Sequence, residues 1–346
     1  MVSETPQEYS VDEEIVYFFS TTSATKSSCD ARAQELVGGS VVPVAVQGNC
    51  SYTVYAGSTH VVQFRLKSLD LDTKMSTLAG EIYGSLIPSA TFHGYIGEQG
   101  IDGKEPLCVY VMNRVKGISH LDFILGHDFP ENSFEYCTWR ENLISDLGEF
   151  LGLSLKYPRN ISSSDREAMI WRYEKDLRQL LDALPSRFCP IIQQSIDSLP
   201  AVFSLPMVLI HKDFGVNNIM VNTDNHLVGV IDWAEAEIGP FGTNFHSLQQ
   251  FMSKYRLRVG WIRYANYETL DRIFWDSLSK GAGGLDPETI KTIKGARIIG
   301  LLRSHGFTSR LKNRPEPEPI RDDESGAYKM LGLDGLLIAP VTKPVD

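Results

Sequence analysis

The sequence has few cysteines, and none of them are spaced as a pair. The five are Cys29, Cys50, Cys108, Cys137 and Cys189, and no C-x-x-C motif occurs. An odd number of scattered cysteines provides neither a disulfide framework nor the ligand spacing of a zinc site. We therefore expect a protein of a reducing compartment, in which each cysteine is a small buried hydrophobic residue.

Long apolar runs and a basic leader are also missing. No stretch of the 346 residues approaches the roughly 20 apolar residues that a membrane-spanning helix needs. The first residues are acidic and lack the basic region of a secretory signal. We therefore expect a cytoplasmic protein that has no membrane partner.

The charge balance lacks the basic excess of a nucleic-acid-binding protein. There are 43 acidic and 33 basic residues, which gives a formal net charge of −10. Phosphate backbones select surfaces rich in Lys and Arg, so nucleic acid is not an expected partner. The acidity suits a cationic substrate, or it serves solubility alone.

The length and the order of the sequence patterns predict an α+β protein with two lobes. Strand-like segments at 41–48, 51–57, 60–67 and 106–115, with one helix at 71–86, predict a small β-rich N-terminal lobe over residues 1–111. A hinge at 112–117 precedes a mainly helical lobe over 118–346. In that lobe the periodicity predicts helices at 141–155, 168–184, 191–199, 246–257, 267–280 and 287–303. Three short strands at 208–210, 219–221 and 227–232 interrupt the helices.

Three polar side chains lie in or beside these short strands. Asp213 follows the first strand, Asn218 leads into the second, and Asp232 ends the third. If the second and third strands pair as a hairpin, Asn218 and Asp232 face each other across its open end. Two oxygen ligands and a nearby carboxylate are what a magnesium nucleotide site needs. The spacing Asp-x-x-x-x-Asn is also that of a kinase catalytic loop.

The segment HKDFGVNNIMV, followed by GVIDWAEAEIGP, resembles the aminoglycoside phosphotransferase and choline kinase superfamily. The resemblance is strongest from about residue 208 to residue 242, and the N-terminal lobe matches in pattern and order. It implies a bilobal protein-kinase-like fold, with Asp213 as the catalytic base and His211 as the residue that braces the loop. Asn218 and Asp232 correspond to the metal ligands.

The chain departs from the family pattern at two positions. Lys212 stands where the family usually has Gly, and its side chain either contacts a phosphate or points to solvent. Asn244 stands where the family commonly has Asp. An amide can still accept a hydrogen bond, so we expect Asn244 to retain the contact with the loop.

The N-terminal lobe is expected to hold the nucleotide. Arg65 occupies the place of the strand Lys of kinases, and its guanidinium can bind phosphate. Glu81 in the following helix is its expected anchor, unless both are surface residues. The turn around Asn49 and Cys50 offers backbone amides to phosphate, and the hinge backbone would contact the base. The expected nucleotide-binding residues are Arg65, Glu81, Gly48, Ser51, Met112 and Arg114.

The acceptor site is expected in the helical lobe. Glu235 and Glu237 follow the metal-binding aspartate, and Trp261 and Tyr264 supply aromatic rings. Acidic and aromatic groups together would suit an amine, although core packing explains the rings equally well.

The resemblance implies a magnesium-dependent phosphotransferase that uses ATP or GTP and a hydroxyl group of a small molecule. The acceptor classes are amino alcohols, aminoglycosides, sugars and specialised metabolites. A nucleotide-binding scaffold that has lost transfer is the alternative favoured by Arg65 and Lys212, and a kinase fold recruited to another reaction stays possible. A protein kinase is disfavoured, because no APE-like segment follows Asp232.

Overall fold

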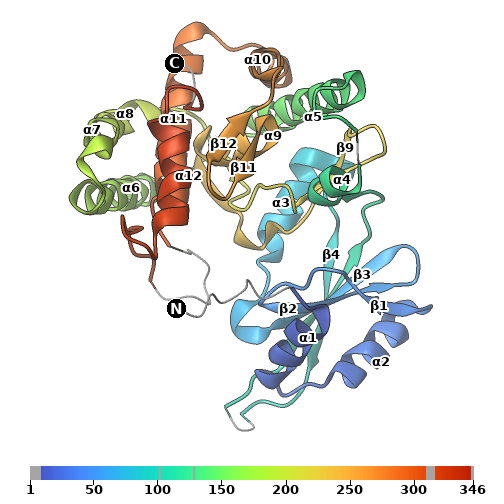
Figure 1. Cartoon of the computed structure of the whole chain (residues 1–346). Coiled ribbons are helices and arrows are strands. Elements are labelled where there is room, and N and C mark those ends of the chain that lie inside the picture. The colour runs from blue at the N-terminus through green and yellow to red at the C-terminus, as the bar shows by residue number, and fades with distance from the viewer. Residues whose placement is uncertain (1–8, 101–102, 128, 309–315, 344–346) are drawn as a thin grey trace. The chain divides into compact units, whose positions relative to one another are not determined.

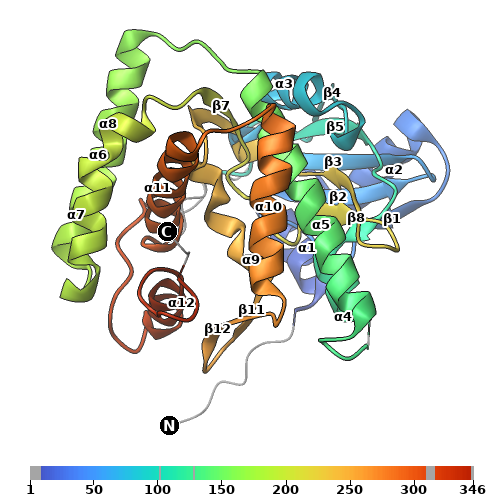
Figure 2. The ribbon, with the colours of Figure 1, turned by 90° about the horizontal axis from the view of Figure 1, so that it is seen from above.

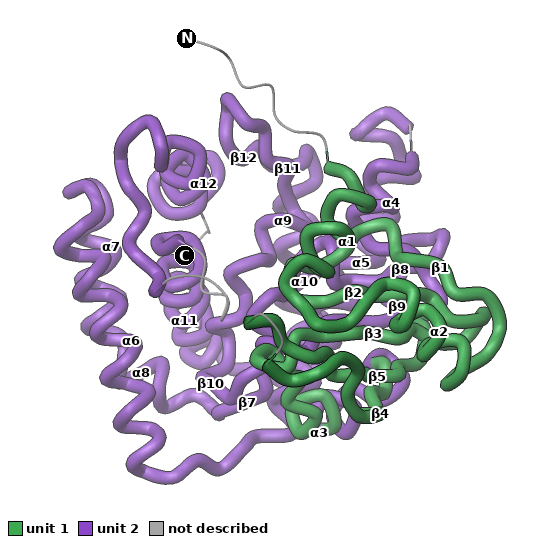
Figure 3. The backbone as a smooth tube through the Cα atoms, turned by 90° about the horizontal axis from the view of Figure 1, so that it is seen from below, with its two compact units in different colours: residues 1–77, 88–115 green, residues 78–87, 116–346 purple. Residues whose placement is uncertain are grey.

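The computed structural model describes residues 9–100, 103–127, 129–308 and 316–343 (Figure 1). Parts of the acidic N-terminal segment and of the Pro-Glu segment lie outside the described residues. The chain forms two compact units (Figure 3): unit 1 is Met1–Thr77 with Pro88–Val115, and unit 2 is Leu78–Ile87 with Lys116–Asp346. The boundary after Val115 falls inside the predicted hinge, but the segment 78–87 joins unit 2.

Unit 1 contains a five-stranded antiparallel sheet in the order β1-β2-β3-β5-β4. The strands are β1 (Val41–Pro43), β2 (Ser51–Ala56), β3 (His60–Leu66), β4 (Ala90–Ile96) and β5 (Leu107–Asn113). The β-branched and aromatic residues that predicted these strands alternate between two faces of the sheet, and those of β2 and β3 include the buried Tyr52, Val54, Val62 and Phe64. The four predicted strands are found, the first of them only over Val41–Pro43, whereas β4 was not predicted.

Two helices of unit 1 add to the single helix that the sequence predicted. They are α1 (Val11–Ser20) and α2 (Lys26–Val37). Each begins at a hydroxyl side chain that accepts a backbone N–H, Ser10 for α1 and Thr25 for α2. Apolar residues of both helices, such as Phe18 and Cys29, share a core with Phe64 of the sheet. The predicted helix is α3 (Thr73–Tyr83), whose second half belongs to unit 2.

The helices of unit 2 are α4 (His120–Gly126), α5 (Phe134–Leu153), α6 (Ser163–Ala183), α7 (Cys189–Asp197), α8 (Leu199–Val202), α9 (Gln249–Met252), α10 (Tyr267–Ala282), α11 (Pro287–His305) and α12 (Ala327–Leu337). Helices α5 and α10 lie side by side (Figure 2). Glycines make this close approach possible, because a Cβ at Gly152 would lie 2.4 Å from the carbonyl oxygen of Leu278. A Cβ at Gly281 would lie 2.6 Å from the carbonyl oxygen of Glu149.

Short strands occupy the middle of unit 2. Strand β7 (Met207–Ile210) pairs with β10 (Glu237–Pro240), and β6 (Ile118–Ser119), β8 (Ile219–Val221) and β9 (Leu227–Val230) form a second group. The predicted hairpin of β8 and β9 is confirmed. The predicted helix at 246–257 is confirmed only in part: α9 covers Gln249–Met252, but the second part is strand β11 (Ser253–Arg256), which pairs with β12 (Gly260–Arg263). No helix among the described residues is both long and apolar enough to span a membrane.

Candidate active site

The loop between β7 and β8 brings two of the predicted site residues into direct contact. The side-chain amide of Asn218 donates a hydrogen bond of 2.8 Å to Asp213 Oδ2 and another of 2.8 Å to the Asp213 carbonyl. The backbone N–H of Asn218 also donates to the carbonyl of Gly215 at 2.9 Å. Asn218 is buried, so these bonds fix the loop and the direction of the Asp213 carboxylate.

The hairpin of β8 and β9 sets the position of Asp232. Ile219 pairs with Val230, and the carbonyl of Asn218 accepts the N–H of Ile231 at 3.0 Å across the open end. Asp232 follows immediately, with a left-handed backbone (φ 60, ψ 64). This conformation costs energy for a residue with a Cβ, and such residues cluster at functional sites. At Asp232 this backbone conformation turns the chain out of the hairpin, at the same end where Asn218 lies.

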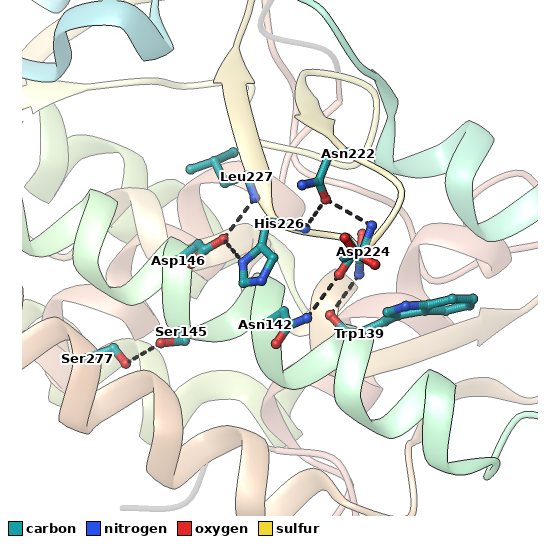
Figure 4. Close-up of polar contacts among 10 residues, drawn as sticks. Trp139, Asn142, Ser145, Asp146, Asn222, Asp224, His226, Leu227 and Ser277 are labelled. Carbon is teal, nitrogen blue, oxygen red and sulfur yellow. Dashed lines mark hydrogen bonds and ion pairs between the residues drawn. The ribbon is translucent and has the colours of Figure 1, made fainter.

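Helix α5 holds the closed end of this hairpin (Figure 4). Asp146 Oδ2 accepts the backbone N–H of Leu227 at 2.9 Å and lies 2.9 Å from His226 Nδ1. Asn142 donates to the carbonyl of Asp224 at 3.0 Å, and Asn225 donates to the carbonyl of Trp139 at 2.9 Å. Asn222 Oδ1 accepts two N–H groups inside the turn, from Asp224 and His226. The hairpin that ends in Asn218 and Asp232 is therefore anchored to a long helix.

His211 forms a hydrogen bond to the backbone of the residue before Asp232. Its side chain is buried, and Nε2 donates to the carbonyl of Ile231 at 2.9 Å. Its ring lies 4.7 Å from that of Trp233 in an edge-on arrangement. Burial lowers the pKa of His211, although the Ile231 carbonyl and the carboxylates of Asp232 and Asp213 oppose this. A neutral imidazole thus joins the strand before the loop to the residue before Asp232.

The surroundings of Asp213 raise its pKa. Burial raises the pKa of Asp213, the hydrogen bond from Asn218 lowers it, and the carboxylate of Asp232 raises it. The residue as a whole is exposed to solvent, so the carboxylate is reachable while neighbouring atoms displace part of its water. A raised pKa makes a carboxylate a better proton acceptor than it is in water.

The donor set fits a magnesium ion that takes further ligands from phosphate and water. Both bonds to Asp213 use the Nδ2 of Asn218, which leaves its Oδ1 for a cation, and the Asp232 carboxylate is exposed. Magnesium commonly binds one or two protein oxygens and completes its shell with substrate phosphates and water. Within the described residues no group of three or more His, Cys, Asp or Glu could hold a metal alone.

A pocket of about 520 Å³ lies beside Asp213 within unit 2. Lys212, which was expected to contact phosphate or solvent, has its Nζ 3.5 Å from Glu237 Oε2. Glu235 and Glu237 line the pocket, as does the C-terminal part of α11. The other lining residues include Tyr173, Asn218, Asn244, His246, Ser247, Gln250, Arg303 and His305.

Both aromatic candidates lie away from this pocket. Trp261 on β12 packs against Tyr255, with ring centroids 5.1 Å apart, and the guanidinium of Arg140 lies 3.7 Å from the ring centre of Tyr264. Neither Trp261 nor Tyr264 lines the pocket. Packing within unit 2 accounts for both rings.

The expected contact of Asn244 with the loop is not found. Asn244 is buried, and its Oδ1 has no hydrogen-bond partner among the described residues. His246 has that role instead, because its imidazole contacts the Thr243 carbonyl and the backbone of Lys212. Sequence reasoning missed His246 and Arg303. His246 follows the GPFGTNF segment and could have been considered, but nothing local marks Arg303 near the end of α11.

The expected nucleotide-binding residues lie mostly in unit 1. Arg65 is buried, and its Nε donates to the carbonyl of Leu69. Ser51 accepts a hydrogen bond of 3.2 Å from Gln63, and Gly48 accepts the N–H of Ser51 at 3.3 Å. Glu81 is an exposed residue of unit 2, so its pairing with Arg65 stays a prediction.

The predicted hinge residues form the end of the sheet of unit 1. Met112 on β5 pairs with Val61 and Ala90. The N–H of Arg114 donates to the carbonyl of Thr59 at 2.8 Å, and its guanidinium lies 3.9 Å from the ring centre of Tyr55. Their part in binding a base stays a prediction.

Solved structures of other proteins have a similar fold. The GDP complex of aminoglycoside 2'-phosphotransferase-IIIa is 14% identical, covers 82% of this chain and 88% of that chain, and has a TM-score of 0.50. A structure from Ralstonia eutropha, described as an aminoglycoside phosphotransferase, is 15% identical over 81% and 88%, with a TM-score of 0.51. At these identities the likeness shows the fold alone, and it confirms the predicted α+β, kinase-like fold. No curated protein matches the sequence.

The family comparison covers the candidate site. The profile of the phosphotransferase enzyme family, APH, matches residues 83–266, which is more than half of the chain and includes Asp213, Asn218 and Asp232. The chain therefore belongs to the phosphotransferase enzyme family.

Proposed function

We propose that the protein transfers the γ-phosphate of ATP or GTP to a hydroxyl group of a small molecule in a magnesium-dependent reaction. The observation that carries this proposal is the contact of Asn218 with Asp213 beside a pocket of about 520 Å³. Phosphoryl transfer needs a positioned carboxylate and oxygen ligands for a metal, and the two lie together here. Some proteins of the same fold were solved with ATP, ADP or GDP.

The side chains have distinct tasks in this reaction. Asp213 orients the acceptor hydroxyl and accepts its proton, which its raised pKa favours. Asn218 holds Asp213 in place through Nδ2 and offers Oδ1 to the metal, and Asp232 supplies a carboxylate ligand. When bound, magnesium neutralises charge on the phosphates. His211 fixes the backbone before Asp232.

The acceptor would enter the pocket beside Asp213. Its volume of about 520 Å³ falls in the range of small-molecule sites. The general proposal covers an aminoglycoside, an amino alcohol, a sugar or another specialised metabolite with a hydroxyl group, and the charges of the pocket narrow these classes below. A cytoplasmic location, where nucleoside triphosphates are present, is part of it.

Thermal unfolding with nucleotide tests the proposal. ATP or GTP at about 100 times its dissociation constant should stabilise the protein by about 2.7 kcal/mol, and only when magnesium is present. Asp232→Ala should lose this magnesium-dependent shift. Asp213→Ala should keep it, because Asp213 acts on the acceptor, while losing phosphoryl transfer in an acceptor screen.

Each outcome has a clear meaning. A magnesium-dependent shift in wild type that is absent in Asp232→Ala supports the nucleotide site. A shift without turnover of any acceptor would favour a nucleotide-binding scaffold. No shift with either nucleotide would refute the proposal.

A further inference from the structure

The pocket beside Asp213 contains an ion pair at the position where the chain departs from the family pattern. Strand β10 pairs with β7 so that Glu237 lies opposite Ile210. Lys212 follows two residues after Ile210, and its Nζ lies 3.5 Å from Glu237 Oε2. Both side chains line the pocket and are partly exposed, at 37% and 39%. The pair is therefore within reach of an acceptor molecule.

A second cation acts on the same carboxylate. Arg303 lines the pocket, lies over the ring of Tyr173 at 3.5 Å, and forms a partly buried ion pair of 2.9 Å with Asp176. Burial lowers the pKa of Arg303, but Tyr173, Asp176 and Glu237 outweigh this and raise it. Glu237 and Arg303 line the same pocket, and the ion pair of Glu237 is the one with Lys212.

These contacts leave little negative charge for an acceptor. The charged residues of the pocket lining are two cations, Lys212 and Arg303, and three carboxylates, Asp213, Glu235 and Glu237. Asp213 is reserved for the reacting hydroxyl, and Glu237 already faces cations. Apart from Asp213, Glu235 is the carboxylate of the pocket for which no ion pair is found among the described residues. A molecule with several ammonium groups needs several free carboxylates, because each desolvated ammonium requires a partner.

We propose that Lys212 determines acceptor specificity by neutralising Glu237, so that the pocket takes a hydroxyl compound with at most one ammonium group and rejects polyamines. The Lys212 ammonium group has three N–H donors, so beside its ion pair with Glu237 it can also donate to oxygen atoms of the acceptor. The inference rests on the proposed function, because it assigns the pocket to the acceptor. It also reverses the expectation that Glu237 binds an amine.

Binding of a polycation to single-charge variants tests the proposal. The probe is kanamycin, which carries several ammonium groups, and its affinity is measured by titration calorimetry without nucleotide at constant ionic strength. Lys212→Met should bind kanamycin at least about tenfold more tightly than wild type, which corresponds to about 1.4 kcal/mol. Lys212→Met with Glu237→Gln should lose that gain, because the carboxylate that was set free is gone.

A matched control separates the pocket from the overall charge. Lys254 also forms an ion pair, with Glu131, and it does not line the pocket. Lys254→Met changes the net charge by the same amount, and it should leave the kanamycin affinity unchanged.

Three results would overturn the proposal. They are equal affinity in wild type and Lys212→Met, no binding to either protein, and an equal gain in Lys254→Met. Since the titration contains no nucleotide, these results are separate from a failure of the proposed function, which the magnesium–ATP thermal shift would reveal.

Discussion

Asn218 Nδ2 lies 2.8 Å from Asp213 Oδ2, and it also donates to the Asp213 carbonyl at 2.8 Å. One amide thus fixes both the backbone and the carboxylate of the residue five positions before it. The same side chain leaves its Oδ1 for a cation. In the proposed reaction, one side chain would therefore link the proton acceptor to the metal.

Replacing this amide separates its two roles. Asn218→Asp keeps an oxygen ligand for magnesium but places a second carboxylate beside Asp213, which should raise the pKa of Asp213 further. We expect magnesium-dependent ATP binding to persist, while the acidic limb of the kcat profile moves to higher pH. Asn218→Ala has no oxygen ligand for magnesium, so it should lose magnesium-dependent nucleotide binding. If the pH profile of kcat is the same for Asn218→Asp and wild type, the contact between Asn218 and Asp213 is contradicted.

The left-handed backbone of Asp232 predicts a difference between two variants that both remove the carboxylate. Glycine adopts φ 60 without strain, whereas alanine does not, so Asp232→Gly should be more stable than Asp232→Ala by about 1 kcal/mol. Both variants should lose the magnesium-dependent thermal shift. Urea denaturation without nucleotide measures the stability difference, and a more stable alanine variant would rule out this backbone conformation.

Two glycines of α11 provide a matched pair for packing. A Cβ at Gly300 would lie 2.0 Å from the carbonyl oxygen of Thr243, whereas a Cβ at Gly295 meets nothing within 4 Å. Gly300→Ala should reduce the free energy of unfolding by at least about 2 kcal/mol through overpacking. Gly295→Ala should increase it by about 0.5–1 kcal/mol, because alanine favours a helix. Equal stabilities of the two variants would show that α11 is not held against Thr243.

Buried histidines predict a loss of stability in acid. Burial lowers the pKa of His120 to about 4, of His246 to about 3 and of His305 to about 4. Between these values and the ordinary histidine pKa of about 6.5, the unfolded chain binds more protons than the folded chain. Stability should therefore be complete above that pH and fall toward pH 4, by as much as about 1.4 kcal/mol per pH unit for each histidine.

Urea denaturation at pH 7, 6 and 5 measures this slope. His305→Gln should reduce this slope by the contribution of about one bound proton, or about 1.4 kcal/mol per pH unit. The raised pKa of Asp213 has the opposite effect on stability. Above the ordinary aspartate pKa it lowers stability as the pH rises, because the charged form is disfavoured in the folded state. A stability that is flat from pH 7 to pH 5 would show that the histidines are not buried in neutral form.

The centre of the candidate site could be predicted because its signals are local. Asp213 and Asn218 are five residues apart, and the apolar strands around them are short and clear. The hairpin joins Asn218 to Ile231 over a turn of few residues, so strand pairing alone places Asp232 nearby. The hydrogen bonds from Asn218 to Asp213 and from Ile231 to Asn218 lie within one continuous segment.

The rest of the pocket could not be predicted, because it depends on contacts between distant segments. The partner of Lys212 is set by the pairing of β7 with β10, and Arg303 arrives from α11. The segment 246–257 has apolar residues near helical spacing, yet Ser253–Arg256 bonds to Gly260–Arg263 instead. Gly260, with φ 85, allows the reversal, and the strand partner outweighs the local helix preference.

The division of α3 between the two units limits how the protein can be cut into fragments. The ring of Tyr83 stacks on Phe150 at 4.1 Å and lies 5.5 Å from Trp233, the residue after Asp232. A truncated fragment that begins at Lys116 would expose these rings and remove the support of the backbone beside Asp232. A separately expressed unit 2 would therefore need residues 78–87, supplied as a linked segment or as an added peptide.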